Sequence, residues 1–216
     1  FDIHEIDRAW MLNQKSGAGP FGMMDQVGLN VMTDAMSNFT DTENDNQVRS
    51  DAAQDFLNPF IERGDLGAKT GKGFYAYPEP DFLKPEFLAG KEENKEISGA
   101  ILNAFFATAM MLVIDDIASL EEIDRCWMAI HHCEAGPFGL MDQKGLDVVL
   151  QELDDRLSLY ESLLGEVPEI VESQKLISKF LNGYIESGKL GEKSNQGFYT
   201  YPDPVFKKPE FILIPD

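Results

Sequence analysis

EIDRAWMLNQKSGAGPFGMMDQVGL, residues 5–29, decides the fold, because a closely related stretch, EIDRCWMAIHHCEAGPFGLMDQKGL, returns at residues 122–146. The two stretches are identical at 16 of 25 positions. A second related pair follows at residues 61–88 and 185–212, with 17 of 28 positions identical. A sequence that repeats at this scale is typical of one supersecondary unit used twice. The chain is therefore predicted to contain two modules of the same fold.

The two copies differ at the front and in length. An apolar stretch, residues 99–119, precedes the second copy, and its counterpart in the first copy would lie before Phe1. The first copy is therefore predicted to lack its first helix, and we expect the chain to be a fragment. The offset between the copies grows from 117 to 124, so the connecting segment is seven residues longer in the second copy. We place the modules at residues 1–90 and 91–216, with Tyr77–Lys95 as the linker.

Apolar residues recur at helical spacing in both copies, which predicts an all-α fold. The clearest apolar face is formed by Ile101, Phe105, Ala109, Leu112 and Ile117. Further helices are predicted over Val48–Arg63 and Ile170–Ser187, each ending near a glycine. Pro20 and Pro137 are each expected to open a helix, where a missing N–H costs nothing. Pro59 is expected to kink or split the first of the longer helices.

Composition excludes several classes of function. The chain has 216 residues and a formal charge of -20, so nucleic acid is not an expected partner, since phosphate contacts need clustered Lys and Arg. No apolar run is judged to reach the length of a membrane span, and the richest one, Ile101–Ile117, contains Asp115 and Asp116. Cys126 and Cys133 lie seven apart on a predicted helix, about 10 Å, too far for a disulfide. A reducing cytoplasm is the expected location.

The stretch Gly17–Gly22 matches G-x-G-x-x-G, the pattern of a dinucleotide-binding turn. Its context argues against that function, because the motif follows a predicted helix rather than a strand and no βαβ pattern surrounds it. The second copy also has Glu134 in place of Gly17, a poor neighbour for a pyrophosphate. We interpret the glycines as a helix–helix turn that permits close packing.

Other reactive side chains have simpler structural interpretations. The run His131–Glu134 cannot direct all four side chains to one metal from a helix, so no metal site is predicted. Four aspartates recur in both copies: Asp7, Asp25, Asp124 and Asp142. They would serve as an acid–base pair in one interpretation. Interaction with helix dipoles and caps is the commoner role, and we favour it.

The glycine-rich stretch GAKTGKGFY, residues 67–75, is the strongest ligand candidate, because a lysine there can meet a phosphate or ribose where the backbone permits close approach. The alternative, which is commoner for a residue of this kind, is that Lys69 is a solvated loop lysine. With the preceding IERGDL, this stretch resembles the closing signature of 3-hydroxyacyl-CoA dehydrogenases. GPFGMMDQVGL, residues 19–29, is similar to that family's G-P-F-E-L-x-D-x-x-G-L-D. Both motifs occur in order and twice, so the resemblance covers nearly the whole chain.

The resemblance implies one cofactor-contacting residue in this chain. The family's lysine before T-G matches Lys69 and, in the second copy, Lys193. The second copy reads Lys193-Ser194-Asn195-Gln196, with a bulkier amide in place of Gly71, which weakens Lys193 as a ligand. Lys69 is therefore the predicted cofactor-binding residue, and NAD is the implied cofactor.

No catalytic residue of the family is matched in the chain. The family's catalytic histidine and glutamate belong to its Rossmann domain. An asparagine of an N-R motif matches Asn103, but Ala104 replaces the arginine, so Asn103 is interpreted as a relic in the second copy. Gly22 and Gly139 also stand where the family often has glutamate.

The resemblance implies two all-α modules of the kind that ends 6-phosphogluconate dehydrogenases, packed within the chain as a pseudo-twofold pair. It implies the substrate-side and dimerisation part of an NAD-dependent enzyme of fatty-acid β-oxidation that converts 3-hydroxyacyl-CoA to 3-oxoacyl-CoA. The expected partners are acyl-CoA and a Rossmann domain of the same polypeptide, which would hold most of the NAD. The chain alone is expected to be inactive. The alternative is a non-catalytic acyl-CoA-binding or assembly module.

Overall fold

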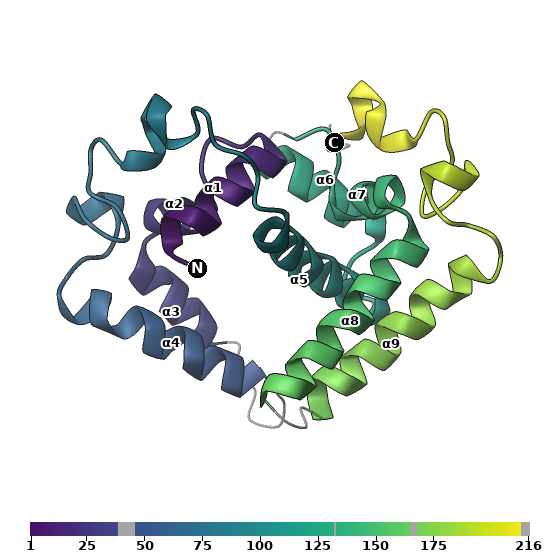
Figure 1. The fold of residues 1–216 in the computed structure, drawn as a ribbon, viewed down its shortest axis with the longest axis horizontal. Coiled ribbons are helices and arrows are strands. Elements are labelled where there is room, and N and C mark those ends of the chain that lie inside the picture. Colours follow the sequence, from purple (N-terminus) through teal and green to yellow (C-terminus); the bar gives the residue numbers. More distant parts are fainter. Residues whose placement is uncertain (39–45, 132, 165–167, 213–216) are drawn as a thin grey trace. The chain divides into compact units, whose positions relative to one another are not determined.

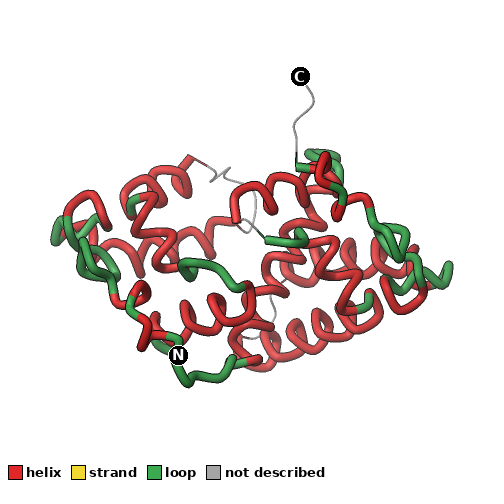
Figure 2. The backbone as a smooth tube through the Cα atoms, turned by 90° about the horizontal axis from the view of Figure 1, so that it is seen from above, coloured by secondary structure: helices red, strands yellow, loops and turns green. Residues whose placement is uncertain are grey.

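The computed structural model describes residues 1–38, 46–131, 133–164 and 168–212. In these ranges it contains helices, 3-10 turns and loops, with isolated β-bridges but no β-strand (Figures 1 and 2). The all-α prediction is therefore confirmed. The chain divides into two compact units, which we call unit 1 and unit 2 and describe separately: Phe1–Gly99 and Ala100–Asp216. The predicted module boundary and the pseudo-twofold packing stay predictions.

The two units share one order of elements (Figure 1). Unit 1 contains α1 (Ile3–Gln14), α2 (Pro20–Val27), α3 (Leu29–Asn38), α4 (Asn46–Glu62) and the 3-10 turns η1 (Ala68–Thr70), η2 (Asp81–Leu83) and η3 (Pro85–Phe87). The division into units falls within α5 (Lys95–Ile114). Unit 2 continues with α6 (Leu120–His131), α7 (Pro137–Lys144), α8 (Leu146–Leu164), α9 (Pro168–Ile185), η4 (Glu192–Ser194), η5 (Val205–Lys207) and η6 (Pro209–Phe211).

Local sequence explains where these helices begin. Pro20 and Pro137 are the first residues of α2 and α7, as predicted. A capping box opens α1, where Asp2 and Glu5 each accept a hydrogen bond from the other's backbone N–H. Ser119 and Glu122 exchange the same pair of bonds before α6. Pro59 lies inside α4 without splitting it.

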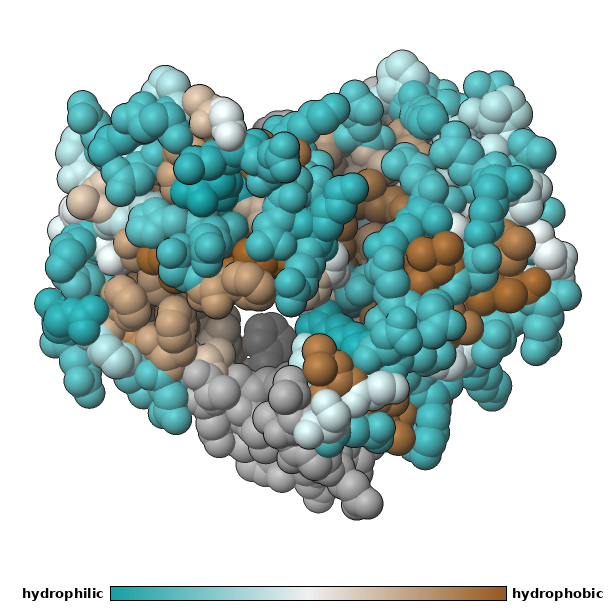
Figure 3. Space-filling model, in the orientation of Figure 1, coloured by the Kyte–Doolittle hydropathy of each residue, from teal (hydrophilic) through white to brown (hydrophobic). Residues whose placement is uncertain are grey.

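Each unit buries its own apolar core, and the segment predicted as a linker belongs to the core of unit 1. Phe82 and Phe87, within Tyr77–Lys95, pack with Met11, Leu29 and Tyr75. The equivalent Phe206 and Phe211 lie in the core of unit 2. The linker prediction was wrong because these aromatic residues were treated as part of an extended tail. Hydrophilic residues cover much of the face seen in Figure 3, as the charge of -20 requires.

The apolar helix α5 is longer than the sequence pattern indicated. It spans 20 residues, contains a window of mean hydropathy 2.0, and is long and apolar enough to cross a membrane. The expectation that no apolar run reaches that length was therefore wrong. Phe106, Ala109 and Met110 of this helix are nevertheless buried in the core of unit 2. About a third of the apolar window, 33%, is buried, so this helix packs on the core along one face only.

Candidate functional site

A buried carboxylate joins α1 to the start of α2 in unit 1. Asp7 has no exposed surface, and its oxygens accept hydrogen bonds from the backbone N–H groups of Phe21 and Gly22, both at 2.8 Å. The Tyr75 hydroxyl donates a third bond at 2.9 Å. Gly19, the N-cap residue of α2, has no side chain to cap the helix. Asp7 therefore supplies that cap from a neighbouring helix.

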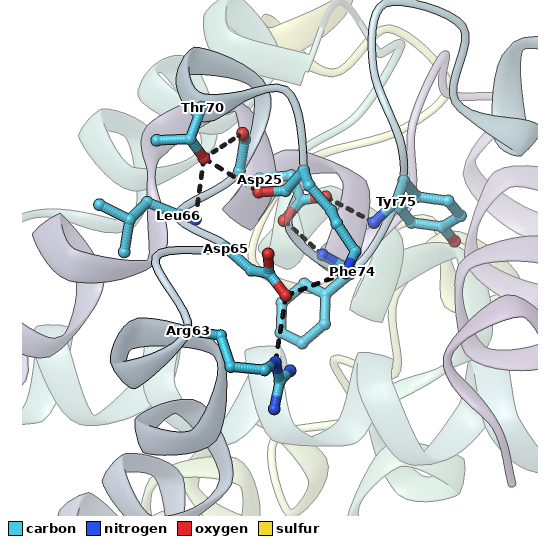
Figure 4. A network of polar contacts seen from close by, with 9 residues as sticks. Asp25, Arg63, Asp65, Leu66, Thr70, Phe74 and Tyr75 are labelled. Carbon is cyan, nitrogen blue, oxygen red and sulfur yellow. Dashed lines mark hydrogen bonds and ion pairs between the residues drawn. The ribbon is translucent and has the colours of Figure 1, made fainter.

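A second buried carboxylate holds the segment that follows α4 (Figure 4). Asp25 accepts bonds from the backbone N–H groups of Phe74 and Tyr75, both at 2.9 Å, and from the Tyr77 hydroxyl at 3.1 Å. It is the sixth residue of α2, so it does not act on a helix terminus as expected. Its role is to fix a turn 49 residues away in the sequence.

Unit 2 repeats both sets of contacts. Asp124 accepts bonds from Phe138 N, Gly139 N and the Tyr199 hydroxyl; Asp142 accepts bonds from Phe198 N, Tyr199 N and the Tyr201 hydroxyl. Their lengths lie between 2.8 and 3.1 Å. We call each set, two aspartates with their backbone and tyrosine donors, the carboxylate network of its unit. The repeated EIDR, MDQ and GFYxY motifs are thus parts of one structural device.

Burial sets the electrostatics of the networks. Desolvation raises the pKa of Asp7 and of Asp142 above the ordinary value for aspartate, and it raises the pKa of Asp124 to about 6. Hydrogen bonds from the backbone oppose that rise in each case. Each of these carboxylates has no exposed surface, so a substrate cannot reach it. The geometry therefore favours structural roles over acid–base catalysis. Asp7 and Asp124 cap a helix, as expected, whereas Asp142, like Asp25, holds a distant turn.

The repeated glycines make room for these carboxylates. A Cβ at Gly19 would lie 2.3 Å from Asp7 Cα, and one at Gly67 would lie 2.2 Å from the Asp25 carbonyl oxygen. Both distances are far inside van der Waals contact. Gly17, in contrast, has nothing within 4 Å of a Cβ built on it. The G-x-G-x-x-G match thus contains a packing glycine, which supports the helix–helix turn predicted from the sequence.

The threonine of the K-T-G stretch also has a structural role (Figure 4). Its hydroxyl accepts from Leu66 N at 2.9 Å and contacts the carbonyl oxygens of Gly67 at 3.1 Å and Lys72 at 3.0 Å. Ser194 makes the equivalent contacts in unit 2. Thr70 therefore closes the turn, which leaves Lys69 as the residue of this stretch with a side chain available to a ligand.

The two lysines of this turn differ in their partners. Lys69 Nζ donates to the neutral Asn30 side chain at 2.5 Å, whereas Lys193 forms an ion pair with Asp147. The turn itself has the same form in both units. Gly71 and Asn195 are both left-handed, with φ of 80° and 58°, so the bulk of Asn195 does not distort it. The physical asymmetry lies in the carboxylate that Lys193 has and Lys69 lacks.

Asn103 and the cysteine–histidine run hold no assembled site. Asn103 is 7% exposed, and its Oδ1 has no hydrogen-bond partner among the described residues. The part of the chain that the structure describes contains no group of three His, Cys, Asp or Glu side chains that could hold a metal ion. His132 of the run His131–Glu134 lies outside the described part of the chain.

The fold and the duplicated networks define a tandem pair of helical modules. The family model for the C-terminal domain of 3-hydroxyacyl-CoA dehydrogenase matches residues 1–77 and 97–201, and the chain belongs to this family. A probable 3-hydroxyacyl-CoA dehydrogenase of Caenorhabditis elegans is 32% identical over 53% of this chain and 34% of its own length. A 3-hydroxybutyryl-CoA dehydrogenase of Mycobacterium tuberculosis is 29% identical over 48% of this chain and 34% of its own length.

The chain thus spans about a third of the length of these curated relatives. A crystal structure of FadB2 from Mycobacterium tuberculosis shares 29% sequence identity with a TM-score of 0.37, covering 48% of this chain and 33% of that chain. The family resemblance inferred from the sequence motifs is confirmed by the family model.

Gly19→Ala should destabilise unit 1 while Gly17→Ala should not. The new Cβ at position 19 overlaps Asp7, and overpacking of this kind costs about 1–3 kcal/mol or more, whereas position 17 is open. Urea denaturation followed by circular dichroism measures both. Equal stabilities for the two variants would show that Gly19 is not a packing glycine.

The pH dependence of stability should change in Asp124→Asn. The pKa of Asp124 in the folded protein, about 6, lies above the ordinary aspartate pKa of 3.8. Its contribution to the free energy of unfolding is therefore fully present below pH 3.8 and is lost as the pH rises through 6. Asparagine does not titrate, so the stability difference between wild type and variant should shrink by up to about 3 kcal/mol over this window. A difference that stays constant or grows with pH contradicts the assignment.

Proposed function

We propose that this chain is the substrate-side and dimerisation part of an NAD-dependent 3-hydroxyacyl-CoA dehydrogenase of fatty-acid β-oxidation. The family match over both modules carries this proposal. The names of the matched relatives support it: one is a 3-hydroxybutyryl-CoA dehydrogenase and another a probable 3-hydroxyacyl-CoA dehydrogenase. The reaction would convert 3-hydroxyacyl-CoA to 3-oxoacyl-CoA, and NAD, when bound, supplies the hydride acceptor.

The described residues fit only a single point of contact with NAD. A dinucleotide cradle needs glycines whose backbone is open to a pyrophosphate, but Gly19, Gly67 and Gly73 are closed by Asp7 and Asp25. The part of the chain that the structure describes therefore offers a lysine rather than a cradle. We propose that a separate Rossmann domain holds most of the NAD and that Lys69 meets a phosphate or ribose of it.

We propose that the first copy is the one that contacts NAD. The Lys69 ammonium group donates a hydrogen bond to the neutral side-chain amide of Asn30. No carboxylate takes the place of Asn30 in this contact, so the lysine charge is not neutralised there. Lys193 already has Asp147 as its counterion. An anionic ligand would have to displace that carboxylate in unit 2, but only an amide in unit 1.

The purified 216-residue chain should show no turnover of 3-hydroxybutyryl-CoA with NAD, because the family's catalytic pair is not matched here. Absorbance of NADH at saturating substrate measures this. The matched control is a protein that joins this chain to its own Rossmann domain, which should be active. Turnover by the chain alone would contradict the proposal. An inactive joined protein that still binds acyl-CoA would instead support the non-catalytic module.

In that joined protein, Lys69→Ala should raise the Michaelis constant for NAD, and Lys193→Ala should leave it nearly unchanged. A charge-assisted hydrogen bond contributes about 1.5–3 kcal/mol, or roughly ten- to hundredfold in affinity. Steady-state kinetics of both variants give the comparison. Equal effects, or a larger effect at Lys193, would mean that the second copy meets the cofactor.

A further inference from the structure

We propose that unit 2 contains a binding site for an amphipathic monocarboxylate, a saturated aliphatic chain with one terminal carboxylate, between α5 and α8. A hollow of about 390 Å³ lies there, lined by Ala100, Ile101, Ala104, Phe105, Thr108 and Arg156. Its size falls in the range of ligand sites and its lining is mostly apolar, although the hollow is shallow and open to solvent. Lys69, the proposed contact for NAD, is not among the residues that line this hollow.

Arg156 is the single charged residue of the lining, and neighbouring groups hold it in place. Its Nη1 donates to the Ala100 carbonyl oxygen at 2.7 Å, which joins α8 to α5 (Figure 1). Its Nε donates to the Tyr160 hydroxyl at 2.7 Å, and its Nη2 donates to the same hydroxyl. The guanidinium carbon lies 5.1 Å from the centre of the Tyr160 ring. A guanidinium has five N–H donors, so two remain for a ligand.

No carboxylate among the described residues forms an ion pair with Arg156, although the chain has 38 acidic residues. Glu152, one turn earlier on α8, pairs with Lys144 at 2.5 Å. Asp155 accepts from Gln151 at 2.9 Å. The counterion of the Arg156 guanidinium would therefore be an anionic ligand. Carboxylates suit this role because they bind arginine with two parallel hydrogen bonds.

The wall of the hollow requires that the rest of the ligand be apolar. Ala100, Ala104 and Thr108 follow one another at intervals of four on α5 and are exposed, and Ile101 and Phe105 border them half-buried. The eight-residue rise from Ala100 to Thr108 is about 12 Å, the length of an extended saturated chain of roughly ten carbons. Because Arg156 contacts Ala100, the carboxylate would lie at that end and the chain would run toward Thr108.

Decanoate below its micelle concentration is the probe, and isothermal calorimetry on the 216-residue chain measures its binding. We expect saturable binding to one site, with decanol bound about tenfold or more weakly because it lacks the charge. Carbon-13 methyl spectra should show decanoate shifting the Ala104 and Thr108 signals. Absence of saturable binding, or equal binding of decanol, overturns the proposal.

Two variants locate the site. Arg156→Gln removes the charge, and Ala104→Leu fills the hollow with a residue of similar helix propensity; each should weaken decanoate binding about tenfold or more. Lys175→Gln, an exposed cation of α9 in the same unit, is the control and should bind as wild type does. Circular dichroism confirms folding, and Ala104→Leu tests the site even where Arg156→Gln does not fold. Unchanged binding in Ala104→Leu places decanoate elsewhere and overturns the proposal.

Discussion

The rest of each unit depends on a buried carboxylate that accepts hydrogen bonds from the backbone of a distant segment. An unpaired charge in a protein interior is very costly, so each aspartate must keep its two N–H donors and its tyrosine hydroxyl. Those donors require the closing turn to reach α2, and the turn in turn requires glycines at its points of contact. One constraint thus explains most of the residues that the two copies share.

This constraint changes what the repeated motifs mean for function. In the closing signature of unit 1, two glycines (Gly67 and Gly73), Thr70 and the aromatic pair Phe74 and Tyr75 all have structural partners inside their own unit. The residues that remain for chemistry are few, and they are the ones that differ between the copies. Lys69 with Asn30 and Lys193 with Asp147 are the clearest example, because the same lysine is neutralised in one unit only.

The sequence predicted the helices because periodicity and helix-opening prolines are local signals, and it predicted the repeat because identity is directly visible. It did not predict the partner of Asp25, which lies 49 residues away, since periodicity carries no information on distant contacts. Asn195 was interpreted by its bulk, but its backbone adopts the left-handed form that asparagine tolerates. The hollow beside Arg156 is formed by residues of α5 and α8 that lie far apart in the sequence, and no motif marks it.

Native-state hydrogen exchange tests the central role of the carboxylate networks most directly. The amides of Phe74 and Tyr75 lie outside every helix and bond to Asp25, whereas the Gly71 amide closes an ordinary turn. Where the networks hold each unit together, the amides of Phe74, Tyr75, Phe198 and Tyr199 should exchange only with global unfolding, as slowly as core helix amides. Exchange as fast as that of Gly71 would contradict the account, because the closing turns would then open without the loss of either fold.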